Sequence, residues 1–212
     1  MNVTKIEELS KSRSKIYIDQ EIAFVLYKGE IRLHKLREGH EISEESYRTI
    51  MEEILPKRAK LRTMNLLQSR DYTTQQLRRK LKEGFYPDQI IEEALAYVSS
   101  YHYTDDLRYA TDYITGHVDS RSRRRIEQDL MGKGIDKNTL EKAWMQWEDM
   151  GGRQDAVGMI EDLLRKRKYD PAVADAKERR KIYAYLAGKG FEAEDIRKAL
   201  ATDYLTDAPF FV

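Results

Sequence analysis

The chain contains, at residues 126–144, the sequence IEQDLMGKGIDKNTLEKAW. Its apolar positions, at intervals of four, ten, three and one residues, are Ile126, Leu130, Leu140, Ala143 and Trp144. Intervals of three and four residues place side chains on one face of an α-helix. Gly134 stands where a helix can end in a left-handed residue. The stretch therefore predicts a helix, a tight turn and a second helix.

The same spacing occurs twice more, once before this stretch and once after it. The earlier copy is Leu77, Leu81, Ile91, Ala94 and Leu95, and the later copy is Ile182, Leu186, Ile196, Ala199 and Leu200. Further helical stretches at residues 57–69, 105–117 and 155–168 precede the three copies. We therefore predict a unit of three helices, about 50 residues long, that is repeated three times and stabilised partly by its neighbours.

The turns inside the three copies are not identical. Gly134 and Gly190 each follow the last leucine of the first helix by four residues, but in the first copy Gly84 comes one residue early. Phe85 then holds the glycine position. Because a Cβ atom disfavours the left-handed conformation, we expect that turn to be built differently. The third copy is longer, and we place its extra residues around 170–174.

The N-terminal segment has a different composition. Residues 14–19 and 22–27 are rich in β-branched and aromatic side chains and flank a polar turn at 19–21, which predicts a hairpin. Residues 3–9 could supply a third strand. A short helix to Leu36 follows, and Ser43 then caps another helix.

These patterns predict a mainly α protein. We expect three tandem three-helix repeats in an elongated, curved array, with a small β-hairpin and helix extension at the N-terminus. The predicted domains are the extension (residues 1–55), repeat 1 (56–103), repeat 2 (104–151) and repeat 3 (152–212).

Composition and motifs argue against several classes of protein. The chain has no cysteine, which suits a reducing compartment. It starts without a signal peptide and has no run of about 18 apolar residues, so we expect a cytoplasmic protein without membrane contact. We also expect a monomer. Four scattered histidines and no nucleophile motif predict no metal, no cofactor and no catalysis.

The net charge is only +1, so binding to nucleic acid would need local basic patches. Such patches recur in the N-terminal turn of the second helix in repeats 2 and 3, just before its first apolar residue, and along that helix in repeat 1. The candidate binding residues are Arg78, Arg79, Lys82, Arg121, Arg123, Arg124, Arg125, Lys133, Arg179, Arg180 and Lys181. At a helix N-terminus, such cations and free backbone N–H groups would attract a phosphate or carboxylate. The alternative is that these are ordinary solvated charges.

Three stretches resemble the RecX family, the regulatory proteins of the RecA recombinase. They are Tyr103–Ala110 (YTDDLRYA), Ile126–Ile135 (IEQDLMGKGI) and Leu77–Leu81 (LRRKL). The hairpin followed by Gly-His-Glu-Ile-Ser at 39–43 is similar to the N-terminal extension of many Gram-positive members. The likeness covers nearly the whole chain and is most specific in repeat 2.

The resemblance implies a non-enzymatic regulator in DNA repair, recombination and the SOS response. It would bind in the groove of the RecA filament on single-stranded DNA and limit ATP hydrolysis, strand exchange and co-protease activity. Contact with the DNA itself would be weak or confined to the filament. Asp105, Asp106 and Tyr109 would fix the junction between repeats 1 and 2.

Two other functions fit the same residues. A helix-turn-helix regulator would read duplex DNA through one recognition helix per unit. A pure protein scaffold would not touch nucleic acid, and its binding would depend little on salt.

Overall fold

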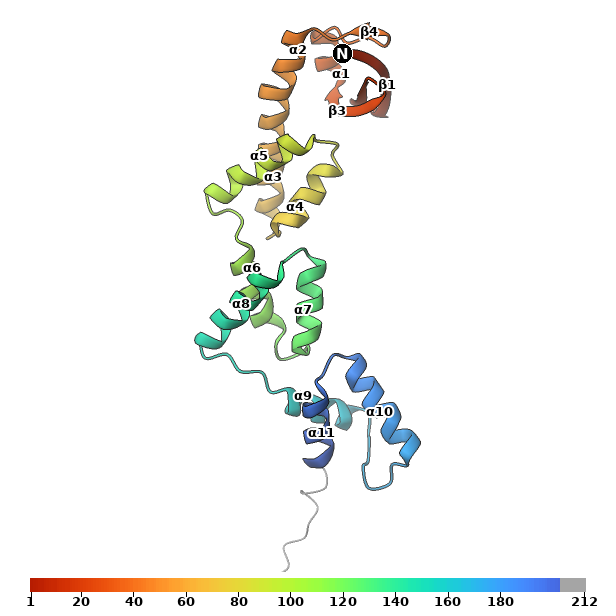
Figure 1. The fold of residues 1–212 in the computed structure, drawn as a ribbon, viewed down its shortest axis with the longest axis vertical. Coiled ribbons are helices and arrows are strands. Elements are labelled where there is room, and N and C mark those ends of the chain that lie inside the picture. The colour runs from red at the N-terminus through yellow and green to blue at the C-terminus, as the bar shows by residue number, and fades with distance from the viewer. Residues whose placement is uncertain (203–212) are drawn as a thin grey trace, which may run out of the picture. The chain divides into compact units, whose positions relative to one another are not determined.

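The computed structural model describes residues 1–202, and Figure 1 shows its elements in chain order. The chain separates into two compact units, Met1–Asp106 and a second that begins at Leu107. It is mainly helical, with three successive three-helix repeats and strands at the N-terminus, as the sequence predicts. Residues 203–212, the predicted end of repeat 3, lie outside the described residues.

The N-terminal strands form an antiparallel sheet in the order β3-β2-β1-β4. Its strands are β1 (Asn2–Ser10), β2 (Arg13–Ile18), β3 (Glu21–Tyr27) and β4 (His40–Glu41). The hairpin turn at Asp19 and Gln20 has positive φ angles of 49° and 75°, which suit the twist of a two-residue turn. The hairpin and the third strand are confirmed. The short strand β4, which pairs with β1, was not predicted because two residues carry no alternating pattern.

A continuous helical run follows the short helix α1 (Lys28–Leu33) and the strand β4. It comprises α2 (Glu44–Thr49), a π-helical turn η1 (Ile50–Ile54) and α3 (Leu55–Ser69). Ser43 caps it, because its Oγ accepts a hydrogen bond from the Ser46 N–H at 3.1 Å. Pro56 lacks an N–H, and a wider turn just before it lets the helix continue. The predicted boundary at residue 56 thus falls inside a helical run.

One hydrophobic core serves the sheet and repeat 1. Buried residues from Val3 in β1 to Val98 in repeat 1 belong to a single cluster. Two further clusters lie in the second unit, one in repeat 2 and one in repeat 3. The N-terminal extension therefore packs as part of repeat 1.

The remaining helices follow the repeat predicted from the sequence. Repeat 1 continues with α4 (Thr74–Lys82) and α5 (Asp88–Ser100); repeat 2 has α6 (Asp106–His117), α7 (Arg123–Gly132) and α8 (Lys137–Asp149); repeat 3 has α9 (Ala156–Lys166), α10 (Ala176–Gly188) and α11 (Ala193–Thr202). Every apolar position of the three copies is buried except Leu200, which is partly buried. The extra length of repeat 3 lies in residues 167–175 and in the longer helix α10.

The turn after α4 contradicts the expectation from Phe85. Phe85 takes the left-handed conformation, with φ of 59°, and the Tyr86 N–H donates to Leu81 O at 3.4 Å. The Ile135 N–H makes the equivalent bond to Leu130 O at 3.1 Å, so both turns are of one kind. Phe85 is half-buried beneath Lys15, whose Nζ lies 4.6 Å from the centre of its ring. This packing offsets the conformational cost of about 1–2 kcal/mol.

Two kinds of feature are absent from the described chain. Within residues 1–202, no helix is both long and apolar enough to span a membrane. In the same part of the chain, no group of three or more histidine, aspartate or glutamate side chains is placed to hold a metal ion.

Candidate functional site

The second helices α4, α7 and α10 carry the predicted basic clusters, and oxygen atoms of the chain already cap their N-termini. In α4 the Gln76 N–H donates to Thr73 Oγ1 at 3.1 Å, and the Thr74 N–H donates to Asp106 Oδ1 at 2.8 Å. Thr73 and Gln76 also form the capping box that the sequence predicts. An incoming phosphate would have to displace these oxygens.

The N-termini of the other two second helices, α7 and α10, are also capped by side-chain oxygens. The Arg125 N–H at the start of α7 donates to Ser122 Oγ at 3.3 Å. At the start of α10, Asp175 Oδ1 accepts from the N–H groups of Lys177 (2.8 Å) and Glu178 (2.7 Å). The expectation that an anion meets free backbone N–H groups here is therefore wrong for these groups. Binding would have to use the side chains.

The clusters also differ in their distance from the helix start. Arg123–Arg125 open α7, as predicted. Arg179–Lys181 lie one turn further in, because α10 begins at Ala176 behind the strong Asp175 cap. In α4, Arg79, Lys80 and Lys82 lie in the last turn, where cations complement the helix dipole, and Arg78 lies in the middle of the helix. The placement of the repeat 3 cluster in a first helical turn is therefore wrong.

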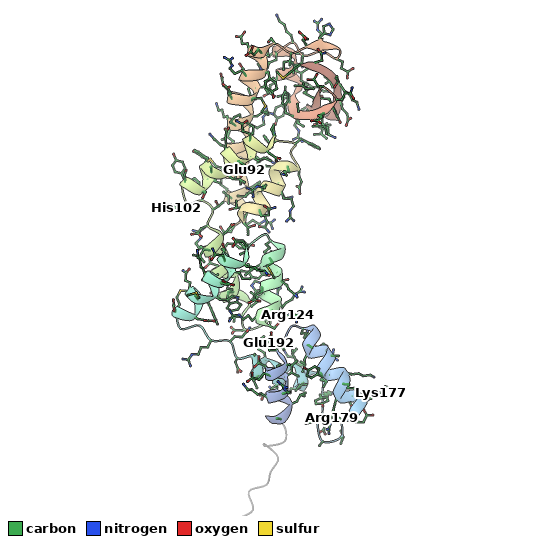
Figure 2. The ribbon with its side chains drawn as sticks, in the orientation of Figure 1. Glu92, His102, Arg124, Lys177, Arg179 and Glu192 are labelled. Carbon is green, nitrogen blue, oxygen red and sulfur yellow. The ribbon has the colours of Figure 1, made fainter. Side chains whose placement is uncertain are left out.

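Arg78 is held inside repeat 1. Its guanidinium donates to both carboxylate oxygens of Glu92 on α5, at 2.9 and 2.7 Å, and to Gln75 at 2.9 Å. The hydrogen bonds to Glu92 raise the pKa of Arg78 above its ordinary value, and those from Arg78 lower the pKa of Glu92. Glu92, labelled in Figure 2, lies on α5. Arg78 therefore joins α4 to α5.

Arg121 makes similar contacts inside repeat 2. One of its nitrogens lies 2.6 Å from Asp129 Oδ2 and 2.7 Å from the hydroxyl of Tyr113. Arg125 lies 3.3 Å from the same carboxylate of Asp129, and the Nζ of Lys133 lies 5.3 Å from the ring centre of Tyr113. Arg121 and Lys133 therefore help to hold α6 and α7 together, whereas the Arg125 pair lies within α7.

Arg123 ties α7 to α8. It pairs with Glu127 on its own helix and with Glu148 on α8, both at 3.1 Å. Its guanidinium lies 4.4 Å from the ring centre of Trp144, a core residue only 2% exposed. A guanidinium over an indole face adds a cation–π attraction to the two ion pairs. Arg123 thus has structural partners on two helices.

Three further candidates have local partners. Lys82 pairs with Asp88 at 3.1 Å. Arg179 donates to the carbonyl oxygens of Ala174 (3.1 Å) and Pro171 (3.3 Å), which fixes the loop before α10, and Arg180 donates to Ala176 O at 3.0 Å.

Arg79, Arg124 and Lys181 differ from the other candidates, and we call them the exposed cations. All three side chains are exposed, and none makes a hydrogen bond or ion pair with the residues that the structure describes. Figure 2 shows Arg124 on α7. Arg79 follows buried Leu77 by two residues, and Arg124 precedes buried Ile126 by two. A step of two residues in a helix reaches the opposite face. Each second helix therefore presents at least one cation that internal contacts do not occupy, and α10 also presents the exposed side chain of Lys177.

Replacing Arg123 with Ala should cost about 1 kcal/mol of unfolding free energy, because the variant lacks the ion pairs and the cation–π interaction. Replacing Arg124 with Ala should leave that free energy within about 0.5 kcal/mol of the wild type, as expected for a surface change. Urea unfolding followed by circular dichroism would measure both. Equal effects would mean that the Arg123 contacts contribute nothing to stability.

The residues predicted to form the junction of repeats 1 and 2 lie at the start of α6. Asp106 accepts the bond from Thr74 described above. Tyr109 packs against the core of repeat 2, and its ring stacks on Tyr113 at 6.5 Å. Asp105 is exposed. The junction role of Asp105, Asp106 and Tyr109 stays a prediction, which the Asp106 bond supports.

Repeats 2 and 3 meet within the second unit at the cap of α7. Ser122 Oγ donates to Lys189 O at 2.7 Å while accepting from Arg125. Gln154, just before α9, donates to the carbonyl oxygens of Val118 and Arg121 at 2.8 and 2.7 Å. These contacts were not predicted, because Ser122 and Lys189 are 67 residues apart.

Comparison with known proteins gives the same order of domains. Residues 59–97, 105–143 and 157–200 match the models of the first, second and third three-helix domains of RecX. The regulatory protein RecX of Caldanaerobacter subterraneus is 32% identical over 202 residues, 94% of this chain and 98% of that protein. That of Clostridioides difficile is 27% identical over 204 residues, 93% of each chain.

Solved structures support the fold. A crystal structure of regulatory protein RecX matches with a TM-score of 0.59 and 23% identity, covering 93% of this chain and 98% of the other. The RecX structure from Lactobacillus salivarius also has a TM-score of 0.59, at 21% identity, and covers 72% of this chain and 98% of the other. On the three domain matches and the full-length relatives, the chain belongs to the RecX family of regulatory proteins.

Proposed function

We propose that the protein regulates a RecA recombinase by binding the filament that RecA forms on single-stranded DNA. It limits ATP hydrolysis, strand exchange and co-protease activity, and it catalyses no reaction itself. It acts as a cytoplasmic monomer in DNA repair, recombination and the SOS response. RecA is the main partner, and the DNA is contacted weakly or only within the filament.

The observation that carries this proposal is the set of exposed cations in a chain of the RecX family. One such cation recurs on the second helix of each repeat, whereas the other candidate residues are held by internal contacts. A guanidinium or ammonium group that makes no internal pair is available for phosphate or carboxylate groups of a partner. Because the net charge is only +1, the chain lacks the bulk charge to hold naked DNA tightly. A mixed protein and DNA surface suits this distribution better.

Co-sedimentation with filaments tests which partner is bound. RecA filaments on single-stranded DNA, the single strand alone and a duplex would each be titrated with the protein at several salt concentrations. We expect tightest binding to the filament, with affinity falling as salt rises because phosphate contacts release counterions.

Two outcomes would favour the other functions. Tight, sequence-specific binding to the duplex would favour a helix-turn-helix regulator. Filament binding that is indifferent to salt would favour a scaffold that touches protein surfaces only.

A further inference from the structure

A cavity of about 340 Å³ lies in the first unit, and none of the candidate binding residues is part of its lining. Its lining comes from the sheet, from α3 and from the turn after α4. The polar and aromatic residues of that lining are Arg13, Tyr27, Arg58, Arg62, Asn65, Phe85 and Tyr86. Its volume is at the lower end of the range for small-ligand sites.

The residues that line the cavity include three arginines and no aspartate or glutamate. Arg58 is engaged, since it pairs with Glu30 and donates to Val25 O at 3.1 Å. The side chains of Arg13 and Arg62 make no hydrogen bond or ion pair with any residue in the described part of the chain. The hydrogen bond with Lys80 lowers the pKa of Glu83, and the charge of Arg62 adds to that effect. Arg58 and Arg62 are four residues apart on α3 and so share one face of the helix. Two guanidinium groups therefore line the cavity without an ion-paired carboxylate.

Aromatic groups lie beside these cations. Tyr27 is opposite Arg13 in the β2–β3 pair, where side chains of facing residues are neighbours. Its ring has Arg58 at 4.7 Å from the centre, yet the residue remains 44% exposed. Part of the ring can therefore still stack on a ligand.

Tyr86 forms another part of the wall. Burial raises the pKa of its phenol, and the charges of Arg58, Arg62 and Arg13 oppose that rise, so all three cations act on this hydroxyl. A Cβ atom at Gly84 would come within 2.9 Å of the Tyr86 ring. The early glycine of repeat 1 thus leaves room for Tyr86 at the cavity.

We propose that this cavity binds a nucleotide, with Arg13 and Arg62 on the phosphate and the exposed ring of Tyr27 against the base. Guanidinium groups match the geometry of phosphate oxygens, and aromatic rings stack on bases whatever their sequence. An acidic peptide would use the arginines but would gain less from the rings. The nucleotide could be free or part of a single strand.

Binding can be measured on the full chain without RecA, so the result does not depend on the proposed function. The probes are thymidine 5′-monophosphate, followed by NMR, and a labelled short oligothymidylate, followed by fluorescence anisotropy. We expect both to bind, and the amide signals of residues 13, 27, 62 and 84–86 to shift with the mononucleotide.

Substitutions test whether Arg13, Arg62 and Tyr27 contact the nucleotide. Arg13→Ala with Arg62→Ala should weaken binding at least about tenfold, the loss expected for charge-assisted hydrogen bonds. The control Arg37→Ala with Lys57→Ala removes two exposed cations of the same unit that do not line the cavity, and it should bind like the wild type. Tyr27→Phe should retain binding and Tyr27→Ala should weaken it.

The outcomes separate the sources of the ligand. Binding of both probes through the cavity supports a general nucleotide site. Binding of the mononucleotide alone supports a site for a free nucleotide, and binding of the oligothymidylate alone supports a site for a single strand. No signal shifts in the wild type, or equal losses in the two double variants, would overturn the proposal. Competition by polyglutamate as effective as that by oligothymidylate would overturn it in favour of an acidic peptide.

Discussion

Replacing Gly190 with Ala should destabilise the second unit by about 2–4 kcal/mol. Gly190 has φ of +89°, which any side chain disfavours, and its neighbours leave no space. An added Cβ would lie 2.7 Å from Ser122 Oγ, 3.3 Å from Arg124 Cβ and 3.4 Å from the Arg125 nitrogen. The Ser122 hydroxyl would have to move, which would break its bond to Lys189 and its cap on α7.

Gly151 provides the matched control for this change. It lies in the same unit with φ of +87°, but a Cβ there would meet nothing within 4 Å. Gly151→Ala should therefore show only the backbone cost, about 1–2 kcal/mol. Urea unfolding of both variants would measure the difference. If Gly190→Ala cost no more than Gly151→Ala, the contact between repeats 2 and 3 would not contribute to stability.

Removing the three exposed cations together should have the largest effect on function. The variant Arg79→Ala, Arg124→Ala, Lys181→Ala should bind RecA filaments about 10–1,000-fold more weakly, because removing each charged hydrogen bond to a phosphate or carboxylate costs on the order of 1 kcal/mol or more. The salt dependence of binding should also become shallower, by up to about one in slope for each phosphate that the variant no longer neutralises. Thermal unfolding should be nearly unchanged, since these side chains make no hydrogen bond or ion pair in the described part of the chain.

A second triple variant controls for net charge. Lys57, Lys142 and Arg197 are also exposed, one in each repeat and outside the second helices, and their side chains make no hydrogen bond or ion pair with described residues. Replacing them with Ala changes the net charge equally. If both triple variants weakened binding to the same extent, overall charge and not the second helices would account for it.

The repeat could be predicted because it depends on local rules. Buried leucines at helical spacing, glycines after helices and caps such as Thr73 all act within a few residues. The prediction for the turn at Phe85 was wrong because packing beneath Lys15 offsets the cost of the left-handed conformation. Lys15 is 70 positions away in the chain, so the sequence pattern did not show this contact. The repeat 3 cluster was placed in the first turn of its helix because the sequence did not show that Asp175, a full turn earlier, caps α10.

The candidate site was harder to predict. Sequence shows that Arg78, Arg79, Arg123 and Arg124 are basic, but not which of them find carboxylates. Arg78 reaches Glu92 and Arg123 reaches Glu148, 14 and 25 residues further along the chain. The cavity was missed for the same reason, because Arg13, Arg62 and Tyr86 come from three separate segments. Only the folded chain sorts the cations into paired and exposed ones.

The measurement that tests the central claim most directly is ATP hydrolysis by RecA on single-stranded DNA, using the recombinase of the same organism while this protein is titrated in. We predict inhibition at a protein concentration well below that of RecA, with the exposed-cation variant far less effective than the charge-matched control. Unchanged hydrolysis, with filaments verified to be present and the protein folded, would contradict the proposed regulation of RecA.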